Sequence, residues 1–194
     1  MKGCRALDEV EVERVLKSFS GESRLRDRCL FLLGVKSGFR ISELLSLRVG
    51  DVLQAGNVAD RVGVARQYMK QKHEGRCVVL HPVAKAAIAE RLAELKAQGR
   101  DQAETYLFTS QRGQNKPLGR IGAWCVLKKA YRSQGLTGKT GTHCLRKTFA
   151  DRVYTKLNFD LVKTSRAMGH RSIQSTMSYL SFKESEIEAA ILSI

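Results

Sequence analysis

The spacing of apolar residues constrains the fold of this chain more than any other feature. Near the N-terminus, Leu7, Val10, Val15 and Phe19 recur at the interval of a helical face, and Asp8 is placed to cap that helix. The same period continues along most of the chain. It predicts further helices over residues 23–37, 40–47, 82–98, 118–133, 142–157, 160–168 and 172–179, and a weakly amphipathic segment from 183 onward.

The period changes once. Residues 58–69 alternate roughly, residues 77–80 form a second short β-like run, and the polar, glycine-containing segment 70–75 lies between them. Two such runs around a polar segment predict a β-hairpin. The expected fold class is therefore α+β and mainly α, with a small antiparallel sheet.

Composition fits one folded domain. The chain is 43% hydrophobic and 27% charged, which is ordinary for a globular protein. It contains neither an apolar run near the roughly 20 residues of a membrane-spanning helix nor the pattern of a signal peptide. No linker rich in proline or serine divides it. We expect a single domain over residues 1–194, located in the cytoplasm.

The charge is strongly positive and unevenly distributed. Lysine and arginine outnumber aspartate and glutamate by 34 to 19, a formal net charge of +15. Residues 61–140 hold 16 basic and 5 acidic side chains, net +11. A basic surface of this size indicates a polyanionic partner, most often a nucleic acid.

The five cysteines do not predict a metal centre. Cys4, Cys29, Cys77, Cys125 and Cys144 are odd in number and widely spaced, and no CxxC or Cys/His ligand cluster is present. Reduced thiols are expected, most of them as small residues of the core.

Two segments pair an arginine with a second functional group on one helical face. Arg40 follows Gly38 and lies three residues before Glu43, so its guanidinium could meet a phosphate; the alternative is a surface ion pair. His143 lies three residues before Arg146, so an imidazole that can accept a proton would lie beside a guanidinium that can bind an anion. The alternative there is a histidine in a capping turn beside a solvated arginine.

The third segment contains a candidate nucleophile. Tyr179 follows His170 by nine residues, and a phenol can attack when a base and an anion site lie beside it. Taken alone, this tyrosine would more often be a packed, half-buried side chain.

Together these segments resemble the catalytic domain of the tyrosine recombinase, or phage integrase, family. That family carries G-x-R-x-S-E-L, a hairpin lysine, H-x-x-R, and L-G-H with a tyrosine nine residues on. This chain has Gly38-Phe-Arg-Ile-Ser-Glu-Leu, His143-Cys-Leu-Arg, and Met168-Gly-His with Tyr179. The methionine replaces the usual leucine. The resemblance covers essentially the whole chain.

The resemblance leaves two candidates for the catalytic lysine. Lys70 and Lys72 both lie on the predicted hairpin, and the usual register, counted back from the run at 76–80, falls between them on Gln71. The turn therefore differs from the family by one inserted or deleted residue. A longer turn favours Lys70, and Lys72 is the alternative.

The resemblance implies strand exchange without metal, ATP or another cofactor. Tyr179 would attack phosphorus and form a 3′-phosphotyrosyl bond, with His143 as the base and the hairpin lysine protonating the 5′-oxygen. The phosphate would be held by Arg40, Arg146 and His170. Glu43 would orient Arg40.

The resemblance also implies double-stranded DNA as partner and a homotetramer on that DNA. The basic middle section supplies candidates for contacts to the DNA backbone, namely Arg61, Arg66, Arg76, Arg120, Lys128, Lys129 and Arg132. The tail over residues 181–194 is expected either to dock into a neighbouring protomer or to pack on its own domain.

Two further expectations concern the extent of the chain and its activity. The helical core-binding domain that usually precedes the catalytic domain is absent, so the chain is either a fragment or a minimal recombinase. The rival functions are a DNA-binding regulator or inactive integrase remnant, and a type IB topoisomerase, which rejoins the same strand.

Overall fold

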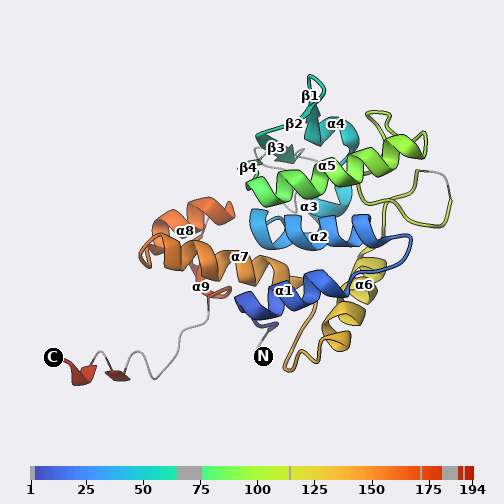
Figure 1. Cartoon of the computed structure of the whole chain (residues 1–194). Coiled ribbons are helices and arrows are strands. Elements are labelled where there is room, and N and C mark those ends of the chain that lie inside the picture. Colours follow the sequence, from blue (N-terminus) through green and yellow to red (C-terminus); the bar gives the residue numbers. More distant parts are fainter. Residues whose placement is uncertain (1–2, 65–75, 114, 171, 181–187, 190) are drawn as a thin grey trace. The chain divides into compact units, whose positions relative to one another are not determined.

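The computed structural model describes residues 3–64, 76–113, 115–170, 172–180, 188–189 and 191–194 (Figure 1). The chain divides into two compact units, Met1–Phe149 and Ala150–Ile194. In the described residues no helix is both long enough and apolar enough to cross a lipid bilayer.

The first unit is mainly helical with two small antiparallel pairs of strands, as predicted. Its order is α1 (Glu9–Ser18), α2 (Arg24–Ser37), α3 (Ile41–Ser46), α4 (Val49–Val52), β1 (Leu53–Gln54), β2 (Asn57–Val58), β3 (Arg61–Val64), β4 (Arg76–Val79), α5 (Pro82–Ala97), α6 (Arg120–Ser133) and the start of α7 (His143–Lys156).

The first helix begins at the predicted cap. The Asp8 carboxylate accepts a hydrogen bond from the Glu11 backbone N–H at 2.7 Å, and the Glu11 carboxylate accepts one from the Asp8 N–H at 3.1 Å. Such a reciprocal box satisfies two backbone donors that have no partner within the helix. Arg5 adds a charged hydrogen bond to Glu11 at 2.6 Å, which ties the segment before α1 to its first turn.

The predicted hairpin is present but begins later than expected. In the β3–β4 pair, Val62 faces Val78 and both are buried, whereas the exposed Arg61 faces the exposed Val79. The expected strand start at Val58 is wrong, because Val58 pairs instead with Leu53 in the separate β1–β2 hairpin. Residues 65–75 of the predicted hairpin lie outside the described part of the chain.

Helix α2 forms the centre of the first unit. It lies between α5 and α1 (Figure 1), and Leu30, Phe31, Leu32 and Leu33 are all buried. Four successive residues point in all directions around a helix, so this stretch of α2 has no face in contact with solvent. At Gly34 a Cβ atom would stand 2.6 Å from Leu145 Cδ1, so the glycine allows α7 to approach α2 closely.

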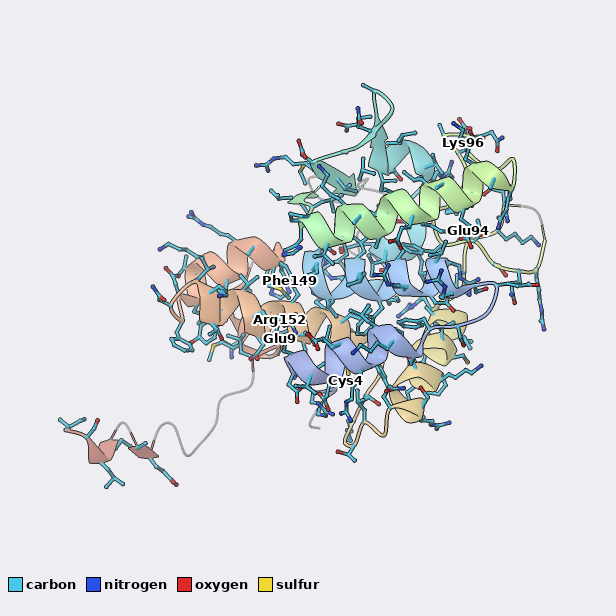
Figure 2. All side chains as sticks on the ribbon, viewed as in Figure 1. Cys4, Glu9, Glu94, Lys96, Phe149 and Arg152 are labelled. Carbon is cyan, nitrogen blue, oxygen red and sulfur yellow. The ribbon has the colours of Figure 1, made fainter. Side chains whose placement is uncertain are left out.

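Gly38 ends α2, as the sequence predicts. Its φ of +64° places it in the left-handed region that favours glycine. A Cβ there would lie 2.3 Å from Cδ1 of Phe149, the α7 side chain labelled in Figure 2. The turn into α3 therefore requires glycine for its backbone conformation and for space.

The second unit contains the end of α7, then α8 (Leu161–Met168) and α9 (Ile173–Met177). The Asp160 carboxylate caps α8 by accepting from the Lys163 N–H at 2.8 Å. Gly169, with φ +63°, ends α8 in the left-handed conformation. Both predicted helices are present, and α9 is shorter than predicted.

The cysteines are free, and three of the five belong to the core or pack against it, as predicted. Cys29 and Cys144 are buried, Cys4 is partly buried, and Cys77 and Cys125 are exposed. Cys77 lies on the outward face of β4 and Cys125 on the outward face of α6. Neither position could be assigned to a face from composition alone.

Replacing Gly38 with alanine should destabilise the protein. We expect Gly38→Ala to lower the free energy of unfolding by about 2–4 kcal/mol, because a left-handed alanine is strained and its Cβ overlaps Phe149. Urea denaturation measures this loss. Gly99→Ala is the matched control: Gly99 has φ +66° and nothing within 4 Å of its Cβ position. Equal losses in both variants would contradict a role for the Phe149 contact.

Candidate active site

Arg40 and Glu43 form a partly buried ion pair at the start of α3. Arg40 Nη1 lies 2.7 Å from Glu43 Oε1, and the Arg40 backbone N–H donates to Glu43 Oε2 at 2.6 Å. The Glu43 side chain is 1% exposed, whereas that of Arg40 is 34% exposed. The reading as a surface ion pair is therefore wrong. One buried carboxylate holds an arginine that solvent, or a ligand, can still reach.

Arg146 is a buried arginine on α7. It is 2% exposed, and its Nη1 donates a hydrogen bond to the carbonyl oxygen of Gly38. Gly38 precedes Arg40 by two residues, so both arginines are fixed at the same turn between α2 and α3. The alternative of a solvated arginine is wrong. A buried guanidinium retains its charge and needs acceptors around it.

His143 is the first residue of α7 and its side chain is exposed. Partial desolvation lowers its pKa below the ordinary value, and the positive charges of Arg146, Arg120 and Lys147 lower it further. The imidazole is therefore neutral at neutral pH and can accept a proton. The neighbouring Cys144 is buried, which raises its thiol pKa to about 12 and keeps it protonated.

His170 and Tyr179 lie side by side in the second unit. Their ring centroids are 5.3 Å apart with an angle of 38° between the planes, and both side chains are partly buried. The His170 backbone N–H donates to the Ser165 carbonyl at 3.0 Å. The predicted nucleophile and the predicted phosphate-binding histidine are thus neighbours.

Thr176 was not predicted from the sequence. Its Oγ1 lies 2.9 Å from Nδ1 of His170, and its carbonyl accepts the Tyr179 N–H at 2.9 Å. The available signal was spacing, because residue 176 lies one helical turn before Tyr179. A threonine in such a serine- and threonine-rich segment has no feature that distinguishes it before the fold is known.

The predicted DNA contacts are placed unequally. Arg61 on β3 and Arg120, Lys129 and Arg132 on α6 are exposed. Lys128 is partly buried and donates to the carbonyl and hydroxyl oxygens of Thr140, at 3.3 and 3.2 Å. Its ammonium group therefore holds the loop between α6 and α7.

The remaining predicted residues lie on the predicted hairpin. Arg76 opens β4, paired with Val64. Lys70, Lys72 and Arg66 lie outside the described residues, so the choice between the two lysines stays open.

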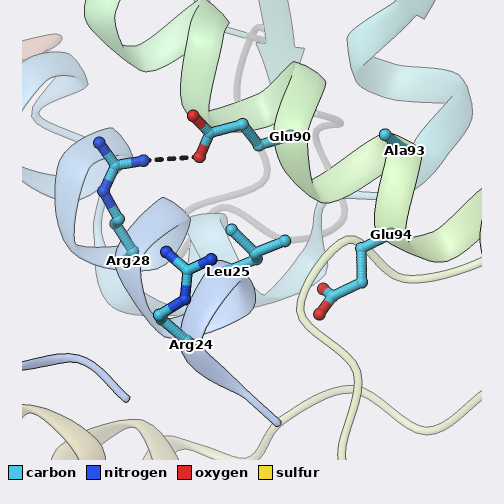
Figure 3. A pocket seen from close by; sticks show the side chains of 6 residues that line it. All are labelled: Arg24, Leu25, Arg28, Glu90, Ala93 and Glu94. Atoms are coloured by element: carbon cyan, nitrogen blue, oxygen red, sulfur yellow. Dashed lines mark hydrogen bonds and ion pairs between the residues drawn. The ribbon is translucent and has the colours of Figure 1, made fainter. Parts of the chain in front are cut away.

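A pocket of about 600 Å³ lies between α2 and α5 (Figure 3) and contains none of the predicted catalytic residues. Arg28 and Glu90 form an ion pair of 2.6 Å across it, with Arg24 and Glu94 nearby. The arginines come from α2 and the glutamates from α5, so positive and negative side chains face each other across the pocket and their charges offset one another.

Comparison with known proteins identifies the family. The model of the phage integrase family matches residues 5–186. The probable integrase/recombinase YoeC of Bacillus subtilis (strain 168) is 31% identical over 186 residues, which are 96% of this chain and 92% of YoeC. The tyrosine recombinase XerD of Corynebacterium glutamicum is 33% identical over 158 residues, 80% of this chain and 48% of XerD.

Solved structures agree. The XerH site-specific recombinase, in a post-cleavage complex with its palindromic difH substrate, superposes with a TM-score of 0.75 at 26% identity, covering 96% of this chain and 51% of XerH. The chain thus spans nearly all of YoeC but about half of XerD and XerH. It belongs to the phage integrase family, the tyrosine recombinases.

The lowered pKa of His143 should depend on Arg120. We expect Arg120→Gln to raise the pKa of His143, because removing a nearby cation favours the protonated imidazole. An NMR titration of the imidazole measures it. Arg132→Gln is the control, since Arg132 lies 12 residues further along α6, about 18 Å at 1.5 Å per residue. An unchanged pKa in Arg120→Gln, or an equal shift in both variants, would contradict the prediction.

Proposed function

We propose that this chain is a site-specific DNA recombinase that cleaves and rejoins DNA through a covalent 3′-phosphotyrosyl intermediate at Tyr179. The observation that carries the proposal is the contact between the rings of His170 and Tyr179. A phenol beside a potential phosphate-binding imidazole is the arrangement that nucleophilic attack on a phosphodiester needs. Membership of the tyrosine recombinase family supports it.

The two arginines act on the phosphate. Arg40 and Arg146 donate to its non-bridging oxygens, where negative charge increases as phosphorus becomes five-coordinate. The Glu43 carboxylate holds the Arg40 guanidinium at 2.7 Å, so less conformational freedom is lost when phosphate binds. Both arginines are fixed in advance at the Gly38 turn, and this preorganisation favours the transition state.

The covalent step exchanges one phosphoester bond for another. The Tyr179 oxygen attacks phosphorus and its proton passes to the neutral His143. The bond from phosphorus to the 5′-oxygen breaks, and Lys70 or Lys72 protonates that oxygen to give a free 5′-hydroxyl. His170 donates to a phosphate oxygen. Attack by another 5′-hydroxyl reverses these steps and releases Tyr179, so neither ATP nor a metal is required.

The partner is double-stranded DNA. The net charge of +15 supports this proposal, and so do the exposed cations of β3 and α6 and the similarity to XerH bound to its difH substrate. Contacts between such cations and the phosphates of the DNA backbone position the duplex but do not distinguish its base sequence. On DNA the chain would act as a homotetramer in the cytoplasm, associated with the nucleoid.

The C-terminal tail over residues 181–194 would join protomers. Ile191, Leu192 and Ile194 are strongly exposed, at 63%, 87% and 106%. Covering such exposed apolar side chains with a neighbouring molecule removes them from water and lowers the free energy. We take residues 1–194 as a single domain, and that domain is the protomer of the proposed assembly.

Replacing the candidate nucleophile should abolish covalent capture. We expect the chain to form a DNA adduct on nicked duplexes taken from the DNA that flanks its own gene, without metal, and Tyr179→Phe to form none. The phenylalanine keeps the ring beside His170 and removes only the attacking oxygen. A denaturing gel resolves the adduct. Tyr106→Phe is the control, because Tyr106 contacts Arg48 in the first unit and should leave the adduct unchanged.

The same assay separates the rival functions. Salt-sensitive DNA binding without any adduct would favour a DNA-binding regulator or inactive remnant. An adduct that leads to plasmid relaxation, with no joining to a second duplex, would favour a type IB topoisomerase.

Two exposed cations of α6 should control the salt dependence of DNA binding. We expect Lys129→Gln and Arg132→Gln each to reduce the slope of log K against log salt by about 1, because each contacted phosphate releases counterions. Fluorescence anisotropy over a salt series measures the slope. Lys96→Gln, at the end of α5 (Figure 2), is the control for lost charge alone. A slope lowered equally in all three variants would contradict specific contacts on α6.

A further inference from the structure

Thr176 is a buried polar residue on a very short helix. It is 0% exposed, and α9 contains only five residues, Ile173–Met177. A buried hydroxyl is normally hydrogen-bonded. Its partner is the imidazole of His170, with 2.9 Å between Thr176 Oγ1 and His170 Nδ1.

The rest of His170 is already fixed by other bonds. Its N–H donates to the Ser165 carbonyl at 3.0 Å, and its own carbonyl accepts from the Ser165 hydroxyl at 3.3 Å. The backbone is therefore held on both sides. What remains is the rotation of the ring and the position of its proton, and the contact with Thr176 Oγ1 restricts both.

Thr176 also contacts the candidate nucleophile through its backbone. The Tyr179 N–H donates to the Thr176 carbonyl at 2.9 Å, and the Tyr179 ring lies 5.3 Å from that of His170. One residue thus holds the imidazole through its side chain and the tyrosine through its main chain. A valine of the same shape would preserve the second interaction and remove the first.

We propose that Thr176 is a positioning residue whose hydroxyl donates to Nδ1 of His170 and so keeps the imidazole proton on Nε2. A neutral imidazole has one donor and one acceptor nitrogen, so an N–H cannot remain on the nitrogen that accepts. An Nε2–H can donate to a phosphate oxygen. The inference rests on the function proposed above, because that phosphate is the expected acceptor.

The direction of this hydrogen bond determines whether Nε2 carries a proton or a lone pair. If Nδ1–H donated to Thr176 Oγ1 instead, Nε2 would carry a lone pair toward the site. That lone pair would repel a phosphate oxygen. Nε2 could donate a hydrogen bond to the phosphate only after it had taken up a proton. The proposed direction gives the enzyme a phosphate donor without that protonation step.

The tautomer can be measured in the free protein. Two-bond proton–nitrogen NMR of ¹⁵N-labelled protein distinguishes the two neutral forms of His170. We expect the Nε2–H form in the wild type and in Thr176→Ser, which retains the hydroxyl, and a mixture of both forms in Thr176→Val. An Nδ1–H form in the wild type, or an unchanged spectrum in Thr176→Val, would overturn the proposal.

Adduct formation on nicked DNA gives the second measurement. We expect Thr176→Val to slow it roughly 10- to 100-fold, as when other bonds that orient a functional imidazole are removed, and Thr176→Ser to restore it nearly to wild type. Thr164→Val is the matched control. Thr164 is also 0% exposed in the second unit, but its hydroxyl donates to the Asp160 carbonyl at 2.7 Å.

The outcomes are distinguishable. Equal slowing in Thr176→Val and Thr164→Val would mean that loss of a buried hydroxyl matters only for stability, and would overturn the positioning role. A wild-type protein that forms no adduct would contradict the proposed function, whereas the tautomer of His170 would still decide the role of Thr176.

Discussion

The hydrogen bond from Arg146 to the carbonyl oxygen of Gly38 is the interaction on which the first unit depends. Burying a guanidinium is costly unless its donors find acceptors, so α7 must meet α2 where a backbone carbonyl points inward. Two glycines make this meeting possible. Gly34 admits Leu145, and Gly38 admits Phe149 while turning the chain toward Arg40. The same contact that completes the core therefore places both arginines.

Burial gives the two arginines different properties. Arg146 is enclosed and positioned by the core, whereas Arg40 stays one-third exposed and is held by the buried Glu43. Their neighbour His143 experiences positive charge from Arg146, Arg120 and Lys147, which lowers its pKa. The positive charges that we propose bind a phosphate thus also lower the pKa of a nearby imidazole. Anion binding and proton acceptance follow from the same local excess of positive charge.

Local chemistry explains what could be predicted from the sequence. The cap at Asp8, the start of α5 at Pro82 and the end of α2 at Gly38 each depend on residues within one helical turn. The β1–β2 pair was missed because two-residue strands have no pattern of their own. The burial of Glu43, the bond from Lys128 to Thr140 and the exposed Cys77 and Cys125 depend on which face meets another element. Spacing identified the family motifs but not these faces.

The second unit shows how polar contacts can position the proposed nucleophile, Tyr179, where little core is available. Helices α8 and α9 have eight and five residues, too few for stability from helix propensity alone. Their positions rest on Asp160 at one end, on the left-handed Gly169 at the turn, and on the bonds of Ser165 and Thr176 to His170. Each bond is directional, so together they fix orientation as well as distance. Apolar packing alone could hold Tyr179 nearby, but it would not determine which imidazole nitrogen carries the proton.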